Sequence, residues 1–103
     1  MPIRAKKKKG ISLLYLSGDM NIYTAAALKD ELMTHLAQPG EREIDLSDVS
    51  EMDSAGLQLL ILAKREAIRT QNILRLTGHS RAVQEVLDLC NMGSYFGDPI
   101  WES

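Results

Sequence analysis

Residues 44–57 constrain the fold most, because a strand pattern there passes through a polar turn directly into a helix pattern. Ile44 and Leu46 form the apolar strand, and the turn that follows is rich in acidic and hydroxyl side chains. From Ser54 onward, apolar residues recur at helical spacing. A strand joined to a long helix by a short turn is typical of a βα unit, so the segment predicts an α/β domain.

Strand and helix patterns alternate along the rest of the chain as well. Residues 11–16 are apolar on both faces, as in an interior strand, and we expect Gly18 to end this strand. A helix follows, with Thr24 as its candidate N-cap, and Pro39-Gly40 ends that segment. The later predicted elements are a helix from Ser54 to about Gln71, a strand over 73–76 and a helix over 80–89. The pattern predicts a four- to five-stranded mixed sheet with about three helices packed against it.

The two ends of the chain have distinctive compositions. Residues 1–10 hold five of the 12 basic residues and no acidic one. Because lysines blunt an exposed sheet edge, residues 3–7 are a candidate edge strand, turned at Gly10 onto the next strand. Residues 95–103 are aromatic but contain Gly97 and Pro99, which predicts an irregular last strand or tail. With 103 residues and 45% apolar content, residues 1–103 are expected to form one domain.

The charge distribution argues against a nucleic-acid partner. Beyond residue 10 the chain has 7 basic and 14 acidic residues, a net charge of −7, whereas nucleic-acid binding needs a basic face. The run from Lys6 to Lys9 leaves contact with an acidic membrane or a nucleic acid as an alternative, although terminal charge runs are more often solvated. No apolar stretch approaches the roughly 20 residues of a membrane span, and no signal peptide follows the lysines. We expect a cytoplasmic protein without stable membrane insertion.

Catalytic and metal-binding patterns are weak. Ser54, Asp53, His35 and His79 supply the residue types of a hydrolytic triad, but the Gly-x-Ser-x-Gly elbow is incomplete around Ser54. Two distant histidines and Cys90, which we expect to pack as a small apolar residue, make no ligand cluster. No phosphate-binding glycine loop is present. We therefore expect no enzyme activity, no cofactor and no metal.

Ser54 lies at the start of the long helix, where two interpretations stay open. Ala55 and Gly56 follow it and are too small to shield its hydroxyl. The first N–H groups of a helix lack intrahelical partners and favour an anion, which suits a serine that is modified. The simpler interpretation is that Asp53 or Ser54 is only the N-cap.

The long helix has a core face and a face that suits docking. At about 100° per residue, one arc collects its core residues, namely Gly56, Leu57, Leu60, Ile61, Ala63, Ala67 and Ile68. Leu62 falls on the polar face, and Leu59 lies at its border, in line with Ala55. We expect an exposed apolar strip beside Ser54, edged by Gln58. Such a strip is a docking surface, an ordinary set of surface residues, or a place where a neighbouring helix packs.

Several motifs, in order over most of the chain, resemble those of STAS domains of the anti-sigma factor antagonist type. They are Leu16-Ser17-Gly18-Asp19, Asp45-Leu46-Ser47, Met52-Asp53-Ser54-x-Gly56-Leu57 and Gly78-His79-Ser80. The resemblance implies that Ser54 is a phosphorylation site. It also implies that the unmodified protein binds an anti-sigma factor or serine protein kinase, and that a metal-dependent serine phosphatase restores it.

Two features depart from the family pattern. Asn21 stands where many phosphorylated members carry an aspartate, which either orients the kinase or only caps the turn. Many members also continue into a further C-terminal helix, whereas this sequence stops at Ser103.

The sequence leads to one preferred function and one alternative. We expect an anti-sigma factor antagonist that is a monomer and that phosphorylation at Ser54 releases from its partner, because the added charge beside Asp48 and Glu51 repels an acidic partner face. The expected partner-binding residues are Asp53, Ser54, Ala55, Gln58, Leu59, Leu62 and Asn21. The alternative is a scaffold subunit of a phospholipid ABC transporter, in which Ser54 is only a cap.

Overall fold

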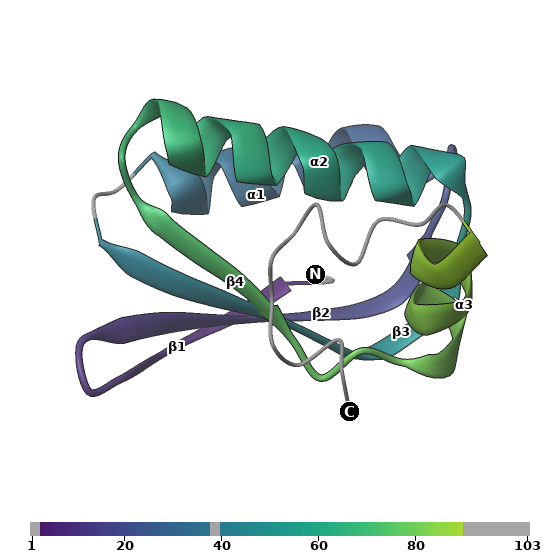
Figure 1. Ribbon diagram of the computed structural model, residues 1–103, viewed down its shortest axis with the longest axis horizontal. Helices are drawn as coiled ribbons and strands as arrows, with labels where there is room; N and C mark the ends of the chain where they lie inside the picture. The colour runs from purple at the N-terminus through teal and green to yellow at the C-terminus, as the bar shows by residue number, and fades with distance from the viewer. Residues whose placement is uncertain (1–2, 38–39, 90–103) are drawn as a thin grey trace.

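The computed structural model describes residues 3–37 and 40–89. A four-stranded sheet with the order β1-β2-β3-β4 forms its base (Figure 1). The strands are β1 (Ile3–Lys8), β2 (Ile11–Met20), β3 (Glu41–Met52) and β4 (Ile73–Thr77). The helices are α1 (Ala25–Leu36), α2 (Ser54–Arg69) and α3 (Arg81–Leu89). The expected α/β class, with a mixed sheet and three helices, is confirmed.

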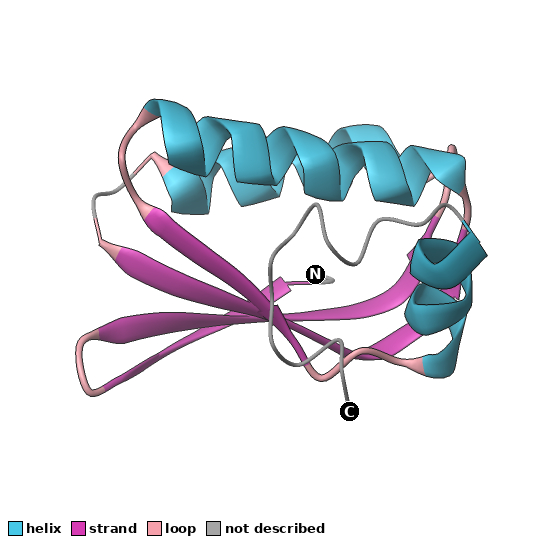
Figure 2. Cartoon of the chain, in the orientation of Figure 1, coloured by secondary structure: helices cyan, strands magenta, loops and turns pink. Residues whose placement is uncertain are grey.

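The connections explain why the sheet is mixed and why two helices share one face. β1 and β2 form an antiparallel hairpin through Lys9 and Gly10, both with positive φ, and β1 lies at the edge of the sheet. β2, β3 and β4 are parallel, joined by α1 and α2. Crossovers of one hand that step in one direction across a sheet place their helices on the same side. Figure 2 shows α1 and α2 side by side over that face, with α3 at one end.

The core lies between this face of the sheet and the two long helices. Leucines recur every fourth residue along α1, and Leu28, Leu32 and Leu36 are all buried there. The sheet contributes its alternate residues, among them Leu14, Leu16, Ile44, Leu46, Leu74 and Leu76, all buried. α3 closes the end of the core with Val83 and Leu87. Its N-terminus is capped by Ser80, whose Oγ accepts from the N–H of Val83 at 3.3 Å.

The strand that begins at Ile11 runs further than the sequence suggests. We expected Gly18 to end it, which is wrong: β2 continues to Met20. Gly18 adopts φ +83° and the pairing with β3 shifts register beside it, so the glycine bends the strand without ending it. Met20 then pairs with Met52 at the end of β3. As a result α1 and α2 both begin at the carboxyl edge of the sheet, next to one another.

α2 differs from the expectation at its last turn. It ends at Arg69, and Ile68 is 65% exposed although we placed it in the core arc. Ala67 occupies the core position of that turn, and the next residue points about 100° away from it. Within residues 3–37 and 40–89, no helix has the length and apolar content needed to cross a membrane. The tail expected over 95–103 and the packing of Cys90 lie outside the described residues.

Candidate functional site

Asp53, and not Ser54, caps helix α2. Asp53 has extended backbone angles, and its Oδ1 accepts from the N–H groups of Ala55 at 2.8 Å and Gly56 at 3.3 Å. Ser54 is the first residue of the helix, and its side chain is exposed. The capping interpretation therefore applies to Asp53, and it leaves the Ser54 hydroxyl accessible at the surface.

This cap changes the electrostatics expected around Ser54. We expected free N–H groups at the start of the helix, ready for an anion. That is wrong for Ala55 and Gly56, whose N–H groups already donate to Asp53. An anionic group on Ser54 would lie beside a carboxylate on the preceding residue. The local effect of such a group would therefore be repulsion more than capture by the helix dipole.

The loop before α1 is tied to the same carboxylate. The N–H of Ile22 donates to Oδ2 of Asp53 at 3.2 Å. Asn21 organises the loop as an Asx turn, because its Oδ1 accepts from the N–H groups of Tyr23 at 2.9 Å and Thr24 at 3.2 Å. Thr24 is the N-cap residue of α1, but its hydroxyl donates to the carbonyl of Asp19 at 2.8 Å and caps no helix N–H.

The loop displays two large apolar side chains that the sequence analysis missed. Ile22 is 63% exposed and Tyr23 is 88% exposed. Their position, two adjacent apolar residues inside a polar turn, could have predicted this exposure, because the residues of such a turn lie at the surface. The Ile22–Asp53 hydrogen bond fixes these side chains next to the start of α2.

An open groove of about 450 Å³ separates α1 from α2. Its lining is mostly apolar, with two basic residues, and consists of Ala25, Ala26, Lys29, Ala55, Gln58, Leu59, Ile61, Leu62 and Arg65. Four of the predicted partner-binding residues, Ala55, Gln58, Leu59 and Leu62, therefore line one groove. The α1 residues could not be anticipated, because the sequence does not say which helix packs beside α2.

The predicted exposed strip is in fact partly the floor of this groove. Leu59 is only 5% exposed, so the expectation of an exposed strip is wrong at this residue, and its burial fits the alternative of contact with a neighbouring helix. It belongs to the core cluster and lines the groove together with Ala25, Ala26 and Lys29 of α1, the helix that lies alongside α2 (Figure 1). Leu62, one turn further along α2, is 37% exposed. The groove thus combines a buried apolar floor with an accessible apolar wall.

Gly56 explains how α2 can begin so close to the strand ends. A Cβ on Gly56 would meet the carbonyl oxygen of Met20 at 2.5 Å and the Met20 Cβ at 2.9 Å. The N–H of Asp53 also donates to the carbonyl of Met20 at 3.2 Å. Close backbone contact therefore holds Ser54 at the edge where both helices start.

Acidic side chains surround this edge. Asp19 and Glu51 pair in register at the ends of β2 and β3, and both are exposed. Asp19 accepts from the hydroxyl of Ser50 at 3.0 Å. Asp48 lies exposed on β3, opposite Ser17 in the register. Across the described part of the chain, no three His, Cys, Asp or Glu residues are placed to hold a metal ion.

The chain belongs to the STAS domain family. The family model described as "Mlab, STAS domain" matches residues 3–97, which is most of the chain. This confirms the family resemblance seen in the motifs.

Solved structures similar to this chain include three described as anti-sigma factor antagonists. One from Mycobacterium paratuberculosis is 23% identical, with a TM-score of 0.78, over 97% of this chain and 86% of that one. A protein from Thermotoga maritima, described as putative, is 21% identical, with a TM-score of 0.77, over 89% and 80%. Unphosphorylated SpoIIAA is 18% identical, with a TM-score of 0.72, over 97% and 90%. Bacillus SpoIIAA in its phosphorylated form is 17% identical, with a TM-score of 0.67, over 97% and 93%. At these identities the likeness establishes a shared fold.

Proposed function

We propose that this protein is a cytoplasmic anti-sigma factor antagonist that works by partner switching. The unmodified form binds an anti-sigma factor or serine protein kinase through the α1–α2 groove and the Ile22–Tyr23 loop. Phosphorylation of Ser54 releases that partner, and a metal-dependent serine phosphatase resets the protein. One observation carries the proposal: Asp53 does the capping, which leaves Ser54 exposed directly beside Ala55, a residue that lines the groove.

The charge of a phosphate explains the release. Phosphorylation adds a charge of about −1.5 to −2. At Ser54 this charge joins the Asp53 carboxylate, which holds the first turn of α2 and the N–H of Ile22. A partner with an acidic face at this corner must then bury a doubly charged group without a basic counterpart. A hundredfold loss of affinity requires about 2.7 kcal/mol, which an unpaired charge in a desolvated interface readily supplies.

The fold itself need not change on phosphorylation. Ser54 is exposed, and its neighbours in the helix are held by the backbone and by Asp53. The likeness of this chain to both the unphosphorylated and the phosphorylated SpoIIAA structures supports this view. The switch then acts at the binding surface.

One observation favours a second candidate function. Asn21 is neutral where many phosphorylated family members carry an aspartate, and here it only organises the loop through the N–H groups of Tyr23 and Thr24. A scaffold subunit of a phospholipid ABC transporter would use the same groove and would need no modification of Ser54.

The two candidates separate in one capture experiment with purified variants. Ser54→Ala and Ser54→Asp are each immobilised and exposed to extract of the native cells, and the retained proteins are identified by mass spectrometry. Partner switching predicts an anti-sigma factor or kinase that is retained by Ser54→Ala and lost with Ser54→Asp. An ATPase retained equally by both variants would support the scaffold. Ala27→Asp is the matched control, since it adds the same charge at an exposed α1 position outside the groove.

A further inference from the structure

A second pocket lies at the opposite end of α1 from the Ser54 site. It measures about 420 Å³ and lies where α1 ends and β2 and β3 begin. Its lining includes no acidic residue and consists of Ala5, Lys6, Lys7, Ser12, Leu14, Thr34, His35 and Arg42. The Lys6 side chain lies on the other face of the sheet, so Lys7, His35 and Arg42 supply the basic side chains. The volume lies in the range of small-molecule sites, which begins at about 300 Å³.

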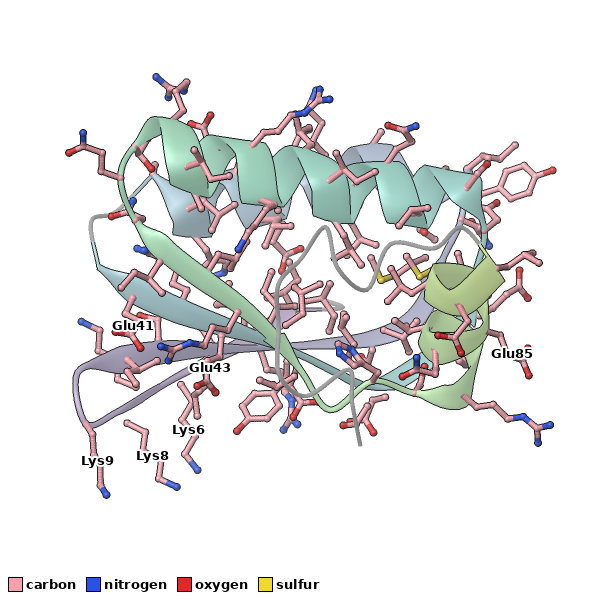
Figure 3. All side chains as sticks on the ribbon, in the orientation of Figure 1. Lys6, Lys8, Lys9, Glu41, Glu43 and Glu85 are labelled. Carbon is pink, nitrogen blue, oxygen red and sulfur yellow. The ribbon has the colours of Figure 1, made fainter. Side chains whose placement is uncertain are left out.

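The register of the sheet gathers three polar residues of this pocket, one from each of β1, β2 and β3, on one face. Lys7 pairs with Ser12, and Ser12 pairs with Arg42, so these three side chains form a row across three strands. In β4 the next residue of this row is Leu74, which is buried in the core beneath the helices. The face that carries Lys7, Ser12 and Arg42 is therefore the one that α1 covers. Lys8 belongs to the other face: Figure 3 shows it on the side of the sheet turned away from α1 and α2.

Arg42 is a buried cation with no carboxylate partner among the described residues. Its residue is only 3% exposed, and its Nη1 donates to the carbonyl of Gly40 at 3.0 Å. Burial lowers the pKa of Arg42, and no nearby charge offsets this desolvation. A guanidinium has five N–H donors, and buried charges are normally paired. The guanidinium N–H groups that do not bond the Gly40 carbonyl therefore suit an anion.

We propose that this pocket binds the phosphate group of a small molecule. The guanidinium fork of Arg42 matches the geometry of phosphate oxygens, and Lys7 supplies a second positive charge to balance a dianion. Ser12, between them in the row, offers a hydroxyl donor, and His35 offers a ring N–H from the last turn of α1. This site is independent of Ser54 and of the partner groove.

The test is a titration of the full ¹⁵N-labelled chain followed by NMR. The probes are inorganic phosphate, glycerol 3-phosphate, and vesicles of phosphatidylglycerol with phosphatidylcholine vesicles as reference. We expect saturable shifts at Ser12, His35 and Arg42 with a soluble phosphate at millimolar concentration or below. Binding of soluble phosphates alone identifies a free phosphate compound as the ligand class, whereas binding of the headgroup in vesicles identifies a lipid.

A matched pair of lysine variants decides whether the pocket is responsible. Lys7→Gln and Lys8→Gln remove the same charge from neighbouring positions on opposite faces of β1. We expect Lys7→Gln to weaken phosphate binding by about tenfold or more, the loss of one charge-assisted contact, and Lys8→Gln to leave it unchanged. Equal effects of the two variants, or no saturable shifts in the pocket, would overturn the proposal. Arg42→Met should abolish binding; if it fails to fold, the lysine pair still decides.

Discussion

The N–H of Ile22 donates to Oδ2 of Asp53 across 3.2 Å, from a loop 31 residues earlier in the chain. The other oxygen of the same carboxylate accepts from the N–H of Ala55 at 2.8 Å. One side chain therefore fixes both the loop that displays Tyr23 and the start of the helix that carries Ser54. This shared anchor ties the two segments beside Ser54 together, so a change of charge at Ser54 would act on both.

Replacing the anchor should therefore weaken both segments at once. Asp53→Ala removes the cap of α2, for which we expect a loss of about 1 to 2 kcal/mol in the free energy of unfolding, measured by urea denaturation. We also expect faster hydrogen exchange at the N–H of Ile22, because its acceptor is gone. Asp48→Ala, a similar change at an exposed position of β3, should stay within about 0.5 kcal/mol of the wild type. Equal losses for both variants would contradict the anchoring role.

Asn21 should be replaceable by the aspartate of other family members without loss of stability. A carboxylate oxygen can accept from the N–H groups of Tyr23 and Thr24 as the amide oxygen does. We expect Asn21→Asp to melt within a few degrees of the wild type, whereas Asn21→Ala should lose about 1 kcal/mol. Thermal melts followed by circular dichroism compare the three proteins. A strongly destabilised Asn21→Asp variant would show that the amide N–H group matters in this loop.

The contact between Gly56 and β2 should tolerate no side chain. Gly56→Ala places a Cβ against the Met20 carbonyl, so we expect a loss of about 1 to 3 kcal/mol in the free energy of unfolding. Alanine otherwise favours helices over glycine, so any destabilisation comes from this contact. Ser54→Ala, two positions earlier and exposed, is the control and should change stability by no more than about 0.5 kcal/mol. A stabilised Gly56→Ala protein would disprove the close packing of α2 on Met20.

The role of the groove in partner binding can be tested separately from Ser54. Leu62→Glu places a charge on the accessible apolar wall, so it should abolish capture of the partner while the protein stays folded. Ile68→Glu makes the same chemical change at a more exposed position of α2 that does not line the groove. We expect it to bind normally. Both variants are compared by capture from extract and by melting temperature, and similar binding of the two would exclude the groove as the interface.

The sequence predicts the order of strands and helices because local patterns determine it. The leucines spaced along α1 and the apolar strand residues around Ile44 each indicate their own element without reference to the rest of the fold. The hairpin of β1 onto β2 follows in the same way from Gly10, whose positive φ suits a tight turn. Chain connectivity then places the helices, because short crossovers between neighbouring parallel strands have one hand.

The site is only partly predictable, because its details depend on which elements become neighbours. The helical wheel puts Ala55, Gln58 and Leu62 on one side of α2, and these residues do line the groove. It cannot show that Leu59 is buried, or that Lys29 of α1 lines the same groove. Asp53 and Ser54 were both candidate caps from sequence, and only the backbone geometry assigns the cap to Asp53.

The most direct test of the switch is the phosphorylation state of the protein purified from its native cells. Intact-mass measurement and peptide mass spectrometry would be compared between growth phases. The account predicts a phosphate on Ser54 whose occupancy varies with growth phase, and it predicts that the phosphorylated fraction carries no bound partner. An unmodified Ser54 under every condition, with a stable co-purifying ATPase, would contradict partner switching and would support the scaffold.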